Sequence, residues 1–113
     1  MDKIARYREL IKRMLSEYAD AVAKHLQNGV ETMLVFDDTR DQYLWLKTGW
    51  KKRHRVYATT VHVRLKNDKI WIEQDWTEDG IATDLLREGV PNEDIVLGFC
   101  DPERRDETEF AVA

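Results

Sequence analysis

The chain has 113 residues, of which 42% are hydrophobic and 35% charged, and this balance fits one soluble domain over residues 1–113 and excludes a disordered chain. The net charge of −4 argues against a protein whose surface as a whole binds nucleic acid. The single cysteine, Cys100, allows no intrachain disulfide and suits a reducing cytoplasm. The charge from Asp2 onward and the lack of any apolar run near about 18 residues predict neither a secretory signal nor a membrane span.

The first 26 residues predict a long helix. Apolar side chains recur at steps of three and four, which is the period of one helix face; they are Ile4, Tyr7, Ile11, Met14, Tyr18 and Val22. Asp2 can cap the start and Asn28-Gly29 is a good stop, so we expect a helix from about Lys3 to Leu26. A stripe of this length is marginal for a coiled coil and better suited to packing on a sheet.

Four strand-like segments follow, over residues 32–36, 42–50, 55–66 and 69–74. Because the connections between them are short, an antiparallel meander is the simplest topology. Alternation within 55–66 predicts that one face meets the helix; that face carries Tyr57, Thr59, Val61, Val63 and Leu65.

A second, shorter helix is predicted from Thr77 to Glu88. The Thr77 hydroxyl can cap its first turn, and Glu78 and Asp79 place negative charge at the positive end of the helix dipole. Gly89 suits a left-handed helix end, and a short apolar strand follows over 95–99. The fold class is therefore α+β, a long N-terminal helix packed on an antiparallel β-meander with a second shorter helix.

Two groups of carboxylates are candidates for a divalent cation: Asp37, Asp38 and Asp41, and Asp75, Glu78 and Asp79. The first group lacks the longer ligand pattern of a helix-loop-helix calcium site, and turn chemistry explains the same residues. A metal-dependent nuclease needs such carboxylates with a nearby lysine, and helix capping explains Glu78 and Asp79. The three histidines stand apart from any metal-binding partner in sequence. We therefore predict no metal and no cofactor.

A run of basic residues lies between the second and third strand segments: Lys47, Lys51, Lys52, Arg53, His54 and Arg55. It fits the solvated tip of a hairpin, and it also fits a patch that contacts phosphates, in which case Lys51, Lys52 and Arg53 are the candidate nucleic-acid contacts. The four tryptophans can stack on bases, although core and interface packing is their commoner use.

The motifs of the chain resemble the XisI family of element excision controlling factors, which occur mainly in cyanobacteria. The resemblance is densest after Arg55 and consists of these elements: Gly49-Trp50, the Lys-Ile-Trp-Ile strand from Lys69, Thr77-Glu78, Gly89-Val90-Pro91, Asp94-Ile-Val-Leu-Gly-Phe99, Pro102-x-x-Arg105 and Thr108-x-Phe110-Ala-Val. The chain departs from the family pattern at Glu73, Trp76 and Cys100, so we expect the surface at that corner to differ.

The resemblance implies a non-enzymatic accessory factor for programmed excision of a DNA element, a site-specific recombination during heterocyst differentiation. It further implies a cytoplasmic protein that binds a XisH-like partner, with the recombinase involved indirectly. The alternative reading is a nucleic-acid-binding protein or a small metal-dependent nuclease subunit. Direct DNA contact and homo-oligomerisation stay open.

The resemblance also points to candidate interaction or structural residues, which are Trp71, Trp76, Thr77, Glu78, Arg105 and Phe110.

Overall fold

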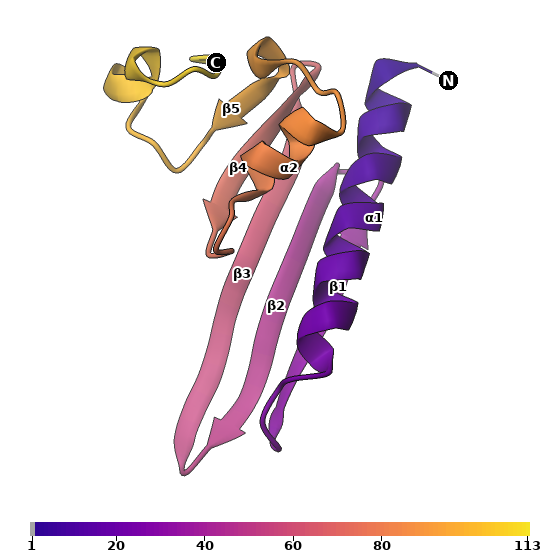
Figure 1. The fold of residues 1–113 in the computed structure, drawn as a ribbon, viewed down its shortest axis with the longest axis vertical. Helices are drawn as coiled ribbons and strands as arrows, with labels where there is room; N and C mark the ends of the chain where they lie inside the picture. The colour runs from indigo at the N-terminus through magenta and orange to yellow at the C-terminus, as the bar shows by residue number, and fades with distance from the viewer. Residues whose placement is uncertain (1) are drawn as a thin grey trace.

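The computed structural model describes residues 2–113. Its elements follow one another along the chain (Figure 1) as α1 (Lys3–Ala23), β1 (Val30–Asp37), β2 (Gln42–Lys51), β3 (His54–Lys66), β4 (Lys69–Asp75), α2 (Ile81–Arg87), the 3₁₀ turn η1 (Asn92–Asp94), β5 (Ile95–Leu97) and the 3₁₀ turn η2 (Pro102–Glu107). The α+β class and the order of helix, four strands, helix and strand are confirmed.

The five strands form one sheet in the order β1-β2-β3-β4-β5. The first three pairings are antiparallel, which confirms the predicted meander. The short strand β5 pairs parallel to β4, because α2 lies between them and carries the chain back to the start of β4. A strand, a helix and a strand in succession are the usual sequence signal for such a crossover.

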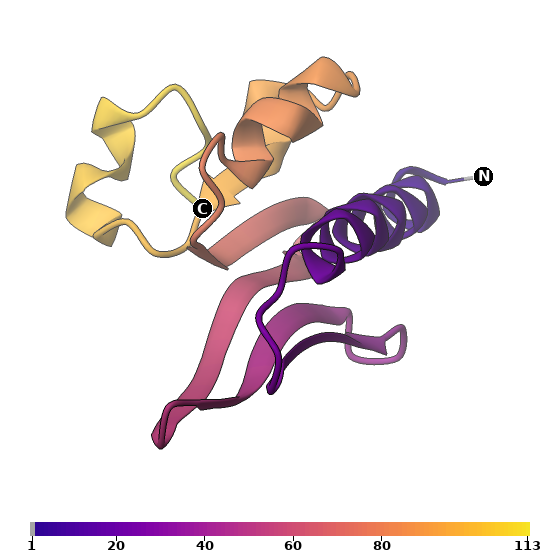
Figure 2. The same cartoon turned by 60° about the horizontal axis from the view of Figure 1, so that its bottom comes forward.

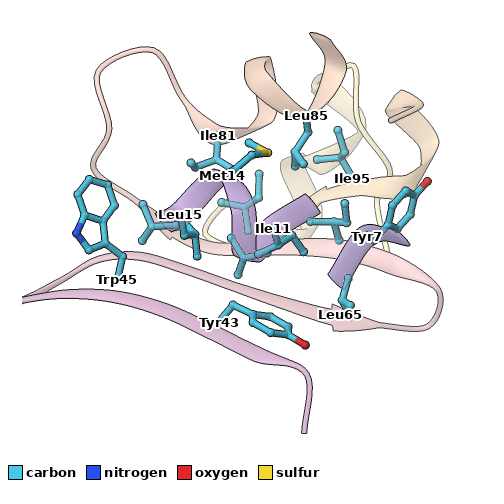
Figure 3. Close-up of a cluster of buried hydrophobic side chains, with 14 of the residues drawn as sticks. Tyr7, Ile11, Met14, Leu15, Tyr43, Trp45, Leu65, Ile81, Leu85 and Ile95 are labelled. Carbon is cyan, nitrogen blue, oxygen red and sulfur yellow. The ribbon is translucent and has the colours of Figure 1, made fainter. Parts of the chain in front are cut away.

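Both helices lie on the same face of the sheet (Figure 2), and we call this the inner face and the opposite one the outer face. The core forms between the helices and the sheet (Figure 3), where Met14 of α1 lies beside Ile81 of α2 and Leu15 lies on the side of Trp45 of β2. Strand β3 contributes Val61 and Val63, both fully buried, as the alternation predicted.

The first helix begins as predicted, because the Asp2 carboxylate accepts a hydrogen bond from the Ala5 backbone N–H at 2.7 Å. It ends at Ala23, three residues before the predicted Leu26. The residues between Ala23 and Gly29 form turns, and Gly29 has a φ of 89° where the chain enters β1. Among residues 2–113, neither helix has both the length and the apolarity needed to cross a membrane.

The prediction for the first half of β3 is wrong because of a β-bulge. Trp45 of β2 lies opposite Val61, and the next residue of β2 lies opposite Thr59, so Thr60 is an extra residue in β3. One extra residue reverses the alternation, so that residues before Thr60 occupy the opposite face from the one that counting back from Val61 by twos predicts. Tyr57 and Thr59 therefore lie on the outer face, and Tyr57 is 67% exposed.

Candidate functional site

The corner between β4 and α2 is organised by Asp75, and not by Thr77 as predicted. The Asp75 carboxylate accepts hydrogen bonds from the Thr77 N–H at 2.8 Å, from the Thr77 hydroxyl and from the Ile81 N–H at 2.6 Å. Helix α2 begins at Ile81, four residues after the predicted start, and Gly80 precedes it with a φ of 88°. Asp75, at the end of the strand, accepts from the first amide of the helix and so acts as its cap. Thr77 donates its hydroxyl to Asp75 and does not itself cap the helix.

We expect Asp75→Ala to lower the free energy of unfolding by about 2 kcal/mol, because three donors lose a charged acceptor. Thr77→Ala removes one donor only and should cost less than about 1 kcal/mol. Chemical denaturation of the two variants tests this order. Equal losses would restore Thr77 as the residue that starts the helix.

The buried Arg105 links the C-terminal segment to the sheet. Its guanidinium donates to the backbone carbonyls of Cys100 at 3.0 Å, Val112 at 3.2 Å and Gly98 at 3.3 Å. The same group lies 5.4 Å from the ring centre of Trp71, an outer-face residue of β4 that is 7% exposed. The C-terminal segment therefore covers the β4 end of the outer face, and Arg105 and Trp71 are buried together.

The other candidate residues lie in two places, the loop before α2 and the C-terminal segment that also carries Arg105. Trp76 is 75% exposed in the loop before α2, and Glu78 is exposed nearby. Phe110 is half-buried and packs against the core cluster. The six candidates thus form two groups, an exposed loop at Trp76–Glu78 and a C-terminal anchor made of Trp71, Arg105 and Phe110.

The acidic loop between β1 and β2 anchors the first helix. Asp41 accepts from Arg8 at 2.9 Å, and Asp38 accepts from Lys12 at 3.0 Å. The hydroxyl of the buried Tyr43 donates to both carboxylates at 3.0 Å.

The pKa values around this loop follow these contacts. The Lys12 ammonium lowers the pKa of Asp38, while burial and the acceptors Asp41 and Asp38 raise the pKa of Tyr43. Within residues 2–113 no group of three or more His, Cys, Asp or Glu side chains is placed to hold a metal ion.

No helix or loop of residues 2–113 lies over the outer face of β1 and β2 (Figure 2), and this face carries a group of apolar side chains that we call the outer patch. The outer patch consists of the side chains of Met33, Val35, Leu44 and Leu46, which pair across the two strands. Met33 is 39% and Val35 48% exposed. Beside the patch, His62 bonds Gln42 at 2.8 Å, and burial lowers the pKa of His62.

The β2–β3 hairpin continues beyond this patch, and we call residues 47–58 the hairpin arm. Lys51 to Arg53 are exposed at its tip. On the outer face of the arm, the Arg55 guanidinium lies 5.4 Å from the ring centre of Trp50 and 5.5 Å from that of Tyr57. Trp50 is 57% exposed, so the tip joins cations to two open aromatic rings. Sequence reasoning missed Tyr57 because the bulge at Thr60 was not foreseen.

Comparisons with known proteins identify the family and the fold. The chain matches the family model for XisI protein over residues 1–112. A crystal structure of a XisI-like protein from Anabaena variabilis has a TM-score of 0.90 and 38% identity, covering 96% of this chain and 98% of that one. A crystal structure of fdxN element excision controlling factor XisI from the same species has a TM-score of 0.88 and 41% identity, covering 99% and 100% of the two chains. No curated protein sequence matches the chain.

The fold and its surfaces define a class of small α+β protein in which two helices cover one face of a sheet and much of the other face is open. The family match spans nearly the whole chain and both structures share the fold. The chain belongs to the XisI family.

Proposed function

We infer that this protein is a non-enzymatic controlling factor for the excision of a DNA element and that it acts by binding a XisH-like protein through the outer patch. One of the two similar structures carries the name of an excision controlling factor. The observation that carries the proposal is the outer patch itself, because an uncovered apolar group on a sheet face is typical of a protein-binding surface.

The charges around the outer patch indicate the chemistry of the partner. Arg55 lies on the same face further along the arm, beyond the Thr48–Tyr57 pair, and Arg64 and Lys66 lie on the outer face of β3. The carboxylates nearby are Glu31 and Asp37, at the two ends of the β1 row, and Glu73. Asp37 is paired with Arg40 at 3.0 Å and Glu73 with Arg64 at 3.0 Å. The rim therefore carries charges of both signs, and the partner surface is expected to be apolar at its centre and polar at its edge.

The alternative of a metal-dependent nuclease subunit draws no support from the acidic side chains. The carboxylates of Asp38 and Asp41 are bonded to cations of α1, and Asp75 is bonded to the start of α2. These contacts use the oxygens that a catalytic metal would need.

Co-expression with a XisH-like protein tests the proposal. The two proteins should co-elute from a size-exclusion column, and a Met33→Glu plus Val35→Glu variant should weaken the complex at least about tenfold, because it buries two charges at the centre of the contact. Both side chains are substantially exposed, so the variant should keep its circular dichroism spectrum.

Phe99→Glu is the matched control. Phe99 is 58% exposed and lies after β5, away from the outer patch. This variant should bind the partner as the unchanged protein does. Absence of co-elution, or an equal loss in the two variants, would refute binding through the outer patch.

A further inference from the structure

We propose that the hairpin arm is a binding site for single-stranded nucleic acid, in which Lys51, Lys52 and Arg53 contact phosphates and Trp50 and Tyr57 stack on bases. This inference goes beyond the proposed partner binding and does not depend on it. It begins from the distribution of charge along the chain.

Positive charge is concentrated in the β2–β3 hairpin. Residues 42–67 contain seven of the 18 Lys and Arg residues and none of the 22 Asp and Glu residues. Among the ion pairs of residues 2–113, Arg64 with Glu73 is the one that involves this segment. The other six cations of residues 42–67 have no carboxylate partner among residues 2–113. The net charge of −4 is therefore the sum of a strongly cationic hairpin and an acidic remainder of the chain.

The arm lies at the far end of the sheet from β5 and α2 (Figure 1) and points away from both helices (Figure 2). The Arg55 guanidinium lies against both Trp50 and Tyr57 and donates to the Gly49 carbonyl at 3.2 Å, so it holds the two rings on one face of the hairpin. A cationic track beside exposed aromatic rings is the arrangement that binds single strands, because every base offers a face for stacking.

The two residues of the turn at the tip are not those that its backbone conformation favours. Lys52 and Arg53 have φ values of 48° and 71°, the left-handed pair of a two-residue hairpin turn, for which Asn and Gly are the favoured residues. The β3–β4 hairpin, which also has a two-residue turn, places Asn67 and Asp68 in the same conformation. The arm instead places two long cations where they project furthest.

A single strand fits these features better than a duplex does. The segments outside 42–67 hold 11 Lys and Arg residues against 22 Asp and Glu residues, and this negative charge repels a duplex that extends past the arm. A duplex also keeps its base faces stacked, so Trp50 and Tyr57 have nothing to stack on. An acidic protein segment would use the cations but would leave the aromatic rings without a role.

Fluorescence anisotropy with a labelled oligothymidylate of about 12 nucleotides tests the site. The full-length protein should bind this strand at low salt at least about tenfold more tightly than a duplex of the same length. Trp50→Ala and Tyr57→Ala should each weaken binding about tenfold. Trp76→Ala is the matched control, because it removes a similarly exposed tryptophan outside the arm.

The paired change Lys52→Asn and Arg53→Gly separates charge from folding. It supplies the residues that the turn favours, so the arm stays folded while two cations are lost. The slope of log affinity against log salt should become shallower by about 1.4, at about 0.7 per phosphate contact.

Three results would overturn the proposal: no binding of the oligonucleotide at about 50 mM salt, a loss in Trp76→Ala equal to that in Trp50→Ala, or competition by polyglutamate with full binding retained in Trp50→Ala. The last result would assign the arm to an acidic protein instead.

Discussion

Replacing Gly49 with alanine should lower the free energy of unfolding by about 3 kcal/mol or more, one of the two largest effects we expect. A Cβ at this position would lie 2.0 Å from the Gly29 carbonyl oxygen and 2.8 Å from the Val30 Cα, both backbone atoms that cannot turn aside. The φ of Gly49 is 146°, a conformation that other residues rarely adopt. The two strands must separate for the methyl group to fit.

Gly49 has this importance because the chain entering β1 crosses closely over the base of the hairpin arm. The Trp50 N–H donates to the Gly29 carbonyl at 2.8 Å, and this bond needs the close approach. Gly89→Ala is the control, because its φ of 91° is also positive but nothing lies within 4 Å of the added Cβ. Gly89→Ala should cost only about 1 kcal/mol in the same denaturation experiment. Similar losses at the two glycines would show that backbone strain, and not contact, governs Gly49.

The sequence predicted the long-range arrangement of the fold well where periodicity was unbroken. The three- and four-residue steps of α1 and the alternation of Val61, Val63 and Leu65 identified buried faces correctly. The bulge at Thr60 escaped prediction, because an extra residue in a strand depends on how the neighbouring strand is paired and not on local residue types. The error moved Tyr57 to the wrong face, and with it half of the aromatic surface of the hairpin arm.

The prediction of the helix start at the β4–α2 corner failed for a different reason. Thr77 followed by Glu78 has the composition of a helix start, but composition does not say which side chain reaches the first amide. Asp75 followed two residues later by Thr77 is also the pattern of an Asx turn, and that local signal could have identified the aspartate. The basic run was found from sequence, whereas the open ring of Tyr57 beside it needed three dimensions.

The C-terminal anchor leads to the second large effect. Arg105→Ala should lower the free energy of unfolding by about 3 kcal/mol, because the guanidinium makes three charge-assisted hydrogen bonds to carbonyls and covers the ring of Trp71. Arg105→Lys should recover part of the loss, since an ammonium keeps the charge but cannot reach the three carbonyls in the planar geometry of a guanidinium. In Arg105→Ala, the backbone amide of Ala111 should exchange its hydrogen faster than in the unchanged protein, because its bond to the Ile95 carbonyl, 2.9 Å long, is in the segment that Arg105 anchors.

The neighbouring Arg104 provides the control in the same turn. Its side chain is 71% exposed and pairs with Glu107, itself 64% exposed, so Arg104→Ala should change stability by less than about 0.5 kcal/mol. A stable Arg105→Ala variant with unchanged exchange at Ala111 would contradict the anchoring role. If that variant also failed to bind the partner, Arg105 and Trp71 would belong to a recognition surface. Under the present assignment, Arg105→Ala loses binding only to the extent that it loses stability, because the outer patch and the hairpin arm lie on β1, β2 and β3.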